Sequence, residues 1–259
     1  LWDLCARRAG QPLWRYLGGT RDVVRPYASG INPDRPQDVV AARRAEGYRA
    51  FKLKVGFGRE RDLANVATVR DVLGADTPLM VDANQGWTLD EALAMAPALA
   101  EAGIAWLEEP LRADRPWAEW QRLAQATTPP LAAGENLLGT PAFEAAIASG
   151  TLRVLQPDLA KWGGISGCWP VVAQGQAAGL RYCPHFLGGG VGLLASAHVL
   201  AAAGGDGLLE IDANPNPLRT ALMGPLTTLV DGACRLGDAP GIGVVPDLED
   251  LADLAARGC

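Results

Sequence analysis

The sequence predicts an α/β protein folded as a TIM-like barrel, in either a (β/α)8 or a (β/α)7β form. Short apolar runs alternate with alanine-rich helical stretches along the chain, and ionisable residues recur at the ends of these runs. The 259 residues include 23 basic and 29 acidic side chains, for a net charge of −6, and 49% are hydrophobic. These values are typical of a globular chain, and the length suits one large barrel or two small domains.

Eight runs have the length and composition of β-strands: 25–30, 50–56, 78–84, 105–111, 130–136, 154–160, 181–186 and 207–213. Between them, helices are predicted near 37–46, 59–73, 88–101, 116–125, 141–149, 164–178 and 190–203. Thr88 and Glu91 form a capping-box pattern at a helix start, and Gly103, Gly150 and Gly179 follow predicted helix ends. Strands that alternate with helices form a parallel sheet, and its simplest closed form is the barrel.

The region after the last predicted strand departs from this alternation. Residues 214–226 are rich in proline and asparagine, so no eighth helix is obvious there. A doubly wound open sheet is the structural alternative, but it requires a switch point and usually a glycine-rich first turn. Neither feature is visible in the sequence.

The composition argues against several classes of partner and compartment. No run of Lys or Arg forms a phosphate-binding track, so we expect no nucleic-acid partner. No uncharged apolar stretch is long enough to cross a membrane, and the first residues lack the order of a signal peptide. The cysteines are odd in number and form no CxxC pair, so we expect reduced thiols in a cytoplasmic protein: Cys5, Cys168, Cys183, Cys234 and Cys259.

An ionisable residue lies near the end of seven consecutive predicted strands. The series is Lys54, Asp82, Glu108, Glu135, Asp158, His185 and Glu210, in steps of 28, 26, 27, 23, 27 and 25 residues. Each step matches one βα unit of about 25 residues. Catalytic side chains of a barrel come from the carboxyl ends of its strands, so this series predicts a site at one mouth of the barrel.

Three carboxylates in the series indicate a metal site. Asp82, Glu108 and Glu135 would converge at the mouth, where like charges repel unless a cation lies among them. Each residue alone would be better explained as a helix cap or a solvated loop charge, but three in phase favour a metal. Oxygen ligands with open positions favour Mg²⁺ over zinc. Three neighbouring residues are candidates to bind substrate or support the ligands: Asn84, Glu109 and Asn136.

Two lysines lie two positions apart on the second predicted strand. Lys52 and Lys54 therefore point to the same side, while Phe51, Leu53 and Val55 would face the helices. Each lysine is expected to depress the pKa of the other, which would make one a general base near neutral pH. The alternative is a pair of solvated lysines without a role at the barrel rim.

Asp158 and His185 end neighbouring predicted strands and form a candidate proton-transfer pair. An Asp that accepts a hydrogen bond from one imidazole nitrogen fixes the tautomer and raises the basicity of the other nitrogen. His198, the second histidine, falls within an apolar helical run and is interpreted as structural.

The motifs together resemble the enolase superfamily, in its mandelate racemase-like subgroup. The resemblance extends from the first residue to about residue 220, and it is carried by the order and spacing of the segments KLK, VDANQGW, WLEEP, AGEN, QPDLAKWGG, PH and LEID. Members of the related muconate-lactonizing and dipeptide-epimerase subgroup place a lysine on the sixth strand, where this chain has Asp158. Lys161 resembles a lysine that accompanies both patterns, and it joins Asn84, Glu109 and Asn136 as a candidate to bind substrate or support the ligands.

The resemblance implies a role for each residue of the site. Asp82, Glu108 and Glu135 would bind Mg²⁺. Lys54 would be the base on one face of the substrate, and Lys52 would neutralise the substrate's carboxylate. His185, paired with Asp158, would act on the opposite face. Glu210 would donate a hydrogen bond to the developing enolate. Such sites pair a Lys or His base with Mg²⁺.

The activity implied is Mg²⁺-dependent removal of the proton α to a carboxylate, giving an enediolate. Dehydration of an acid sugar or a related hydroxy acid is the leading expectation. A racemase or epimerase of a hydroxy or amino acid is the alternative, and a non-catalytic barrel without its capping domain is the third. The partner would be a small carboxylate, and a homo-oligomer is expected from the resemblance.

The same resemblance predicts three segments. Residues 1–20 would be the end of an N-terminal α+β capping domain and its linker, and residues 21–225 the catalytic barrel. Residues 226–259 would return to the side of the capping domain. Both chain ends would then be remnants of a domain whose loops choose the substrate.

Overall fold

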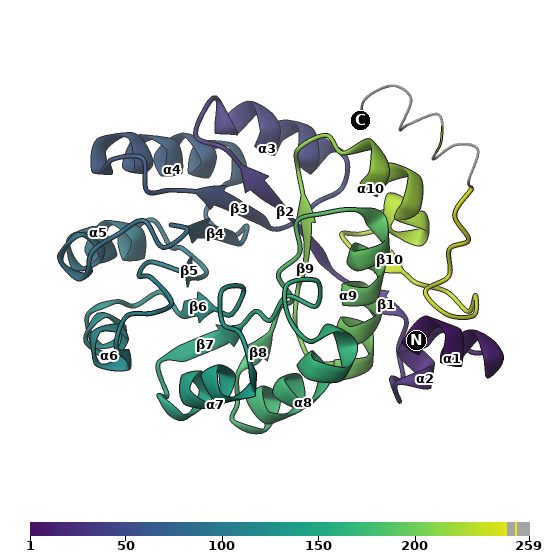
Figure 1. The fold of residues 1–259 in the computed structure, drawn as a ribbon. Helices are drawn as coiled ribbons and strands as arrows, with labels where there is room; N and C mark the ends of the chain where they lie inside the picture. Colours follow the sequence, from purple (N-terminus) through teal and green to yellow (C-terminus); the bar gives the residue numbers. More distant parts are fainter. Residues whose placement is uncertain (248–251, 253–259) are drawn as a thin grey trace.

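The eight predicted strands form one parallel sheet in the computed structural model, which describes residues 1–247 and residue 252. The strands are β2 (Pro26–Ile31), β3 (Phe51–Lys54), β4 (Leu79–Asp82), β5 (Leu107–Glu108), β6 (Leu131–Ala133), β7 (Leu152–Leu155), β8 (Arg181–Tyr182) and β9 (Leu209–Asp212). Their order in the sheet is β8-β7-β6-β5-β4-β3-β2-β9. Strand β2, the first of the eight along the chain, pairs with β9, the last, and the sheet curls into a barrel (Figure 1). The predicted fold class is confirmed.

The curled sheet has a seam between β8 and β9, which share no strand ladder among the described residues. The backbones approach closely there, because a methyl group at Gly207 would lie 2.0 Å from the carbonyl oxygen of Tyr182. The backbone N–H of Phe186 donates to Glu210 across the same seam, at 3.0 Å. The seam is therefore closed by these contacts, which hold the segment after β8 against β9.

Helices cover the outer face of the sheet (Figure 1). They are α3 (Pro36–Ala45), α4 (Arg59–Leu73), α5 (Leu89–Glu101), α6 (Trp117–Ala126), α7 (Thr140–Ala148), α8 (Gly164–Ala177) and α9 (Gly190–Ala203). The predicted capping box of Thr88 and Glu91 is present at the start of α5. Gly103, Gly150 and Gly179 follow the ends of α5, α7 and α8 with φ angles of 64°, 67° and 80°, as expected for helix stops.

The interval after β9 does contain a helix, which corrects the sequence-based expectation. Helix α10 (Pro217–Leu222) is followed by the 3₁₀ helix η1 (Gly224–Thr227). Pro217 occupies the first turn, and the side chain of Asn216 accepts the backbone N–H of Arg219 at 2.9 Å. The proline and asparagine that obscured this helix therefore start it, because proline suits the first turn and asparagine caps it.

The strands separate two apolar clusters. Phe51, Leu53 and Val55 belong to the outer cluster between sheet and helices, as predicted. The inner cluster takes one residue from each strand of the barrel or from the position next to it: Tyr27, Ala50, Met80, Trp106, Ala132, Val154, Cys183 and Leu208. Two positions after each of these come Ser29, Lys52, Asp82, Glu108, Gly134, Gln156, His185 and Glu210. Alternate residues of a strand point to the same side, so this second set also faces the barrel interior. We call the second set the polar layer and the inner apolar cluster beneath it the inner plug.

The two ends of the described chain form one layer beside α9. Helices α1 (Trp2–Arg8) and α2 (Leu13–Tyr16) precede β1 (Val23–Val24), which pairs antiparallel with β10 (Cys234–Arg235). The backbone N–H of Leu13 donates to the carbonyl oxygen of Gly241 at 2.7 Å, so the described part of the later segment lies beside the first helices. Residues 248–251 and 253–259 lie outside the described part, and the predicted boundary at residue 225 falls within η1.

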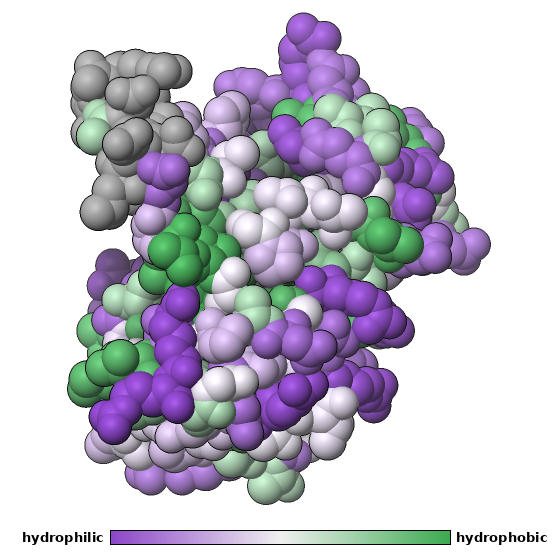
Figure 2. All heavy atoms as spheres, turned by 90° about the vertical axis from the view of Figure 1, so that its right-hand side faces the viewer, coloured by the Kyte–Doolittle hydropathy of each residue, from purple (hydrophilic) through white to green (hydrophobic). Residues whose placement is uncertain are grey.

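Figure 2 shows this side of the molecule, where hydrophobic side chains reach the surface in patches among polar ones. Leu1, Leu4 and Val245 are among the exposed large hydrophobic residues of the terminal segments. No helix in the described residues is long and apolar enough to cross a membrane. The four cysteines that are described are free thiols, in agreement with the sequence, and Cys259 lies outside the described residues.

His198 joins α9 to this terminal layer. Its imidazole Nδ1 accepts the backbone N–H of Trp14, at the start of α2, at 3.0 Å. The side chain is fully buried, and burial lowers the pKa of His198 from 6.5 to about 4. The histidine therefore acts as a neutral structural acceptor, which agrees with the interpretation of the sequence.

Acid is expected to destabilise the protein through His198. The folded state binds fewer protons at this group than the unfolded state between pH 6.5 and about 4. Its contribution to stability is therefore present above pH 6.5 and is lost as the pH falls, by at most about 3 kcal/mol. The asparagine of His198→Asn can still accept from Trp14 but does not titrate. Urea unfolding should show that the variant loses less free energy of unfolding over this pH range than the wild type does. An equal dependence on pH in the two proteins would contradict the lowered pKa of His198.

Candidate active site

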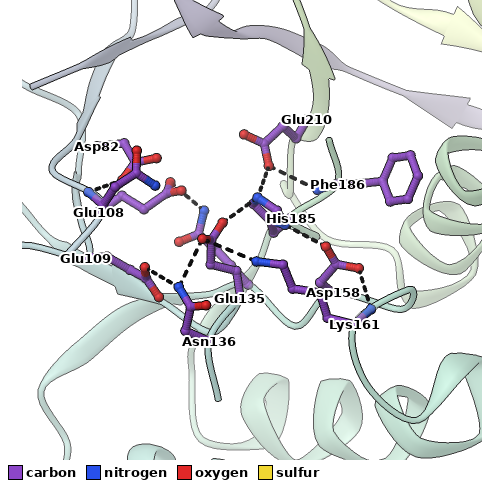
Figure 3. Close-up of polar contacts among 12 residues, drawn as sticks. Asp82, Glu108, Glu109, Glu135, Asn136, Asp158, Lys161, His185, Phe186 and Glu210 are labelled. Carbon is purple, nitrogen blue, oxygen red and sulfur yellow. Dashed lines mark hydrogen bonds and ion pairs between the residues drawn. The ribbon is translucent and has the colours of Figure 1, made fainter. Parts of the chain in front are cut away.

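The polar layer gathers most of the predicted site residues at the carboxyl ends of the strands (Figure 3). The predicted residues labelled there point toward one shared region from β4, β5 and β9 and from the segments that follow β5, β6, β7 and β8. The buried predicted residues, in this layer and directly beside it, are Lys52, Asp82, Glu108, Glu109, Glu135, Asp158, His185 and Glu210. Lys54, Asn136 and Lys161 lie at the edge of this set, and Asn84 is exposed.

Lys52 is a buried cation surrounded by carboxylates. Its Nζ contacts Oε1 of Glu108 and lies 2.7 Å from Oε1 of Glu210 and 3.8 Å from Oδ2 of Asp82. Burial lowers the pKa of Lys52, but Glu108 and Glu210 outweigh it, so the pKa is raised well above the usual value. The expectation that the two lysines lower each other's pKa is therefore wrong for Lys52, because the charged groups nearest to it are carboxylates.

Lys54 lies closer to the mouth than Lys52. Its side chain is 13% exposed, and its Nζ donates to Oδ2 of Asp82 at 2.6 Å. The other oxygen of Asp82 accepts the backbone N–H of Asn84 at 2.8 Å. Asn84 thus orients Asp82 through its main chain, and Lys54 is the lysine that a substrate could reach.

His185 and Asp158 form the predicted pair. Nδ1 of His185 lies 2.7 Å from Oδ2 of Asp158, whose other oxygen accepts the backbone N–H of Ala160 and of Lys161 at 2.7 and 3.1 Å. Nε2 of His185 contacts Oε2 of Glu135. Asp158 is therefore held rigidly, and it leaves Nε2 as the nitrogen that faces the site.

The electrostatic surroundings favour a protonated His185. Burial lowers the pKa of His185, but Glu210 and the hydrogen bonds to Asp158 and Glu135 outweigh it and raise the pKa to about 10. Burial raises the pKa of Glu135, but His185 outweighs it and holds the pKa well below its usual range. In this arrangement the imidazolium is a proton donor toward the mouth.

Glu210 is an ionised acceptor in this structure. It accepts from Oγ of Ser29 at 2.5 Å and from the backbone N–H of Phe186 at 3.0 Å, and it contacts Lys52. Burial raises the pKa of Glu210, but Lys52 and His185 outweigh it and lower the pKa to about 2. The role implied by the resemblance, donation to an enolate, would require a proton to be delivered to Glu210 first.

The predicted metal ligands are held by other partners. Asp82 contacts Lys54, Glu108 contacts Lys52, and Glu135 contacts His185. Among the described residues, no three His, Cys, Asp or Glu side chains are already arranged around one ion position. The ligand set therefore stays a prediction that requires these side chains to exchange partners.

The chemistry of the donors nevertheless fits a divalent ion. Asp82 and Glu108 are register partners on β4 and β5, and all three predicted ligands offer buried carboxylate oxygens. Burial raises the pKa of Glu108 to about 7, and burial together with Glu135 raises that of Glu109 to about 8. Oε1 of Glu109 is buried without a hydrogen-bond partner in the described structure. A divalent ion would favour the ionised form of these buried carboxyl groups.

Two predicted supporting residues contact the carboxylates directly. Asn136 donates from Nδ2 to Oε2 of Glu109 at 2.7 Å and to Oε1 of Glu135 at 3.0 Å. Nζ of Lys161, a half-exposed side chain, lies 3.4 Å from Oε1 of Glu135. Both residues therefore restrain Glu135 from the side of β6 and β7.

Three further residues contact the carboxylates of the site but were not among the predicted site residues. Ser29 binds Glu210, while Trp106 and Gln156 both donate to Oε2 of Glu108, at 3.1 and 2.7 Å. Ser29 and Gln156 could have been found from strand phase, because each lies two positions after an apolar residue of the inner plug. Trp106 offered no such signal, because a large aromatic residue on a strand usually packs.

Several known proteins are similar to this chain. The enolase C-terminal domain-like family matches residues 36–251. The D-galactarolactone cycloisomerase of Agrobacterium fabrum (strain C58 / ATCC 33970) is 36% identical over 269 residues, which cover 98% of this chain and 71% of that protein.

Two solved structures are also similar. A mandelate racemase/muconate lactonizing enzyme from Bordetella bronchiseptica RB50 has a TM-score of 0.95 and 62% identity, and the match covers 99% of this chain and 70% of that one. An L-talarate dehydratase from Polaromonas sp. JS666, complexed with Mg and L-glucarate, has a TM-score of 0.83 and 30% identity, covering 97% of this chain and 69% of that one.

Proposed function

Because the chain belongs to the mandelate racemase/muconate lactonizing enzyme-like branch of the enolase superfamily, we propose that it removes the proton α to the carboxylate of an acid sugar and then expels an oxygen from the β carbon. The observation that carries this proposal is the placement of two candidate proton-transfer groups at one mouth. Lys54 ends β3, and the His185–Asp158 pair follows β8 and β7. Strands β2 and β9 lie between the two groups on one side of the barrel, and β4–β6 lie between them on the other. A substrate between them would meet a group on each face.

The predicted ligands Asp82, Glu108 and Glu135 would hold Mg²⁺, the ion present in the related dehydratase. When bound, the ion supplies positive charge that stabilises the negative charge developing on the substrate's carboxylate. With Asp82 engaged as a ligand, Nζ of Lys54 would be released from its contact with Oδ2 of Asp82, which is 2.6 Å long here, and could turn toward the α carbon of the substrate.

In the leading reaction, Lys54 accepts the α proton and the electrons of that bond form a carbon–carbon double bond. The bond from the β carbon to its hydroxyl oxygen breaks, and the imidazolium of His185 gives its proton to that oxygen, which leaves as water. The resulting enol tautomerises to a 2-keto acid. Asp158 keeps the imidazole oriented throughout, and Lys52 carries a permanent charge beside the reacting carboxylate.

A second candidate differs only in the leaving oxygen. If that oxygen belongs to a ring of the substrate, the same proton transfers open the ring and no water is lost, so the product is an isomer. The similarity to a D-galactarolactone cycloisomerase supports this candidate. Return of a proton to the α carbon on the opposite face would instead give the racemase or epimerase, and the non-catalytic barrel would do none of these.

Metal removal should abolish the reaction. We expect proton NMR in D₂O, with Mg²⁺ and a panel of acid sugars and their lactones, to show loss of the α-proton signal. EDTA or Lys54→Ala should stop this exchange. Product mass then separates the candidates, because a dehydratase product is lighter by one water and a cycloisomerase or epimerase product is not. Exchange that persists in EDTA and in Lys54→Ala would contradict the proposal, and no exchange on any acid would favour the non-catalytic barrel.

The remaining expectations concern partners and location. A small carboxylate is the proposed ligand, with neither a nucleic acid nor a membrane as partner. A homo-oligomer is proposed from the resemblance, and a cytoplasmic location from the unpaired cysteines. The division at residues 20 and 225 into linker, barrel and returning segment is proposed on the same basis. The chain spans about 70% of the length of the relatives described above.

A further inference from the structure

We propose that Trp106 and Gln156 are positioning residues that occupy one oxygen of Glu108, so that this carboxylate binds a metal ion through its other oxygen alone. A ligand restricted to one oxygen would favour Mg²⁺ over Ca²⁺. This inference rests on the proposed function, because it assumes that Glu108 is a ligand of the ion.

The two oxygens of Glu108 have different partners. Oε2 accepts from Nε1 of Trp106 at 3.1 Å and from Nε2 of Gln156 at 2.7 Å. Oε1 contacts the ammonium of Lys52. A carboxylate oxygen has about two lone-pair positions, and two donors therefore saturate Oε2. Oε1 remains the oxygen that can exchange its partner.

The donors that hold Oε2 are themselves immobilised. Trp106 is fully buried in the inner plug and packs edge-to-face on Tyr27, with ring centroids 5.5 Å apart and an interplanar angle of 89°. Gln156 is also buried, and its Oε1 has no hydrogen-bond partner among the described residues. Turning the amide over would place that oxygen against Oε2 of Glu108, where two acceptors repel. The observed orientation is therefore the one that the site stabilises.

The partner of Oε1, in contrast, can be released. Nζ of Lys52 is bound to Oε1 of Glu210 at 2.7 Å as well as to Glu108. The lysine therefore keeps a buried partner when Oε1 of Glu108 turns to an ion. The two oxygens of Glu108 therefore differ: Trp106 and Gln156 saturate Oε2, whereas Lys52, which Glu210 also binds, can leave Oε1.

A single-oxygen carboxylate suits one of the two common divalent ions better. Mg²⁺ requires near-ideal octahedral geometry with ligands at about 2.0–2.1 Å, whereas Ca²⁺ accepts about 6–8 oxygens and often binds both oxygens of one carboxylate. If either donor is removed, Oε2 becomes available to the ion. The site should then lose affinity for Mg²⁺ while it keeps or gains affinity for Ca²⁺.

The test is calorimetric titration of the full chain with Mg²⁺ and separately with Ca²⁺, in wild type, Gln156→Met and Trp106→Phe. Partners of metal ligands typically change affinity by about 10–100-fold, so we expect the Mg²⁺ dissociation constant to rise at least about 10-fold in each variant. The ratio of the Ca²⁺ constant to the Mg²⁺ constant should fall by a similar factor.

Trp120→Phe is the matched control, because Trp120 is equally buried and its Nε1 has no hydrogen-bond partner in the described structure. Its ratio should equal that of wild type. Equal ratios in all four proteins would overturn the positioning role and leave the proposed function intact, whereas absence of Mg²⁺ binding to wild type would overturn both. Trp106→Phe keeps an aromatic ring in the plug, so it decides the matter if Gln156→Met fails to fold.

Discussion

Replacing Lys52 by methionine should lower the free energy of unfolding by about 3–5 kcal/mol at pH 7 in the absence of metal. The ammonium lies in a fully buried position between Glu108 and Glu210. Methionine fills the volume of the side chain but leaves both carboxylates without their counter-charge. Urea unfolding followed by circular dichroism measures the loss.

The matched control for this change is Lys161→Met. Lys161 also faces a carboxylate, with its Nζ 3.4 Å from Glu135, but its side chain is 42% exposed. Water screens such a pair, so the expected loss is at most about 1 kcal/mol. If the two substitutions destabilised the protein equally, the buried ammonium would not be the cation that holds the barrel interior together.

The deficit of Lys52→Met should also depend on pH. Glu210 has a folded-state pKa of about 2, below its ordinary value of 4.5, so it contributes stability above pH 4.5 that is lost as the pH falls toward 2. Lys52 is the first of the groups that lower this pKa. The difference between wild type and variant should therefore be largest at neutral pH and shrink below pH 4.5.

Replacing His185 by asparagine should slow product formation by about 10²–10⁴-fold, the usual contribution of a positioned general acid or base. Asparagine can still donate to Asp158, so that hydrogen bond is retained while the titrating nitrogen is lost. Turnover of whichever acid sugar proves to be the substrate measures the effect. His198→Asn is the matched control, since His198 is structural and lies in α9, outside the polar layer.

Exchange of the α proton in His185→Asn assigns the two roles. Continued exchange with loss of product would identify Lys54 as the base and His185 as the acid that protonates the leaving oxygen. Loss of both would identify His185 as the base. A variant that forms product at the wild-type rate would remove His185 from the mechanism.

Several features of the fold were readable because they depend on short stretches of chain. The interval of 23–28 residues between ionisable residues located the strand ends, and the alternation on β3 assigned Phe51, Leu53 and Val55 to the outer cluster. The pairing of Asp158 with His185 followed from adjacent strand ends. The eighth helix was missed, because Asn216 and Pro217 suggested a loop and in fact begin α10.

The sequence by itself determined the barrel, the edge at which the site lies and the residue types available there, because strand alternation and the length of a βα unit are local properties. Only the tertiary structure decided which of two similar lysines is buried, that Glu210 is an acceptor, and that Trp106 and Gln156 meet on one oxygen of Glu108. These contacts join strands that are far apart in the chain. Burial strengthens the interactions between charged groups and the hydrogen bonds at these contacts. Which side chains are buried together depends on how the strands assemble around the interior of the barrel.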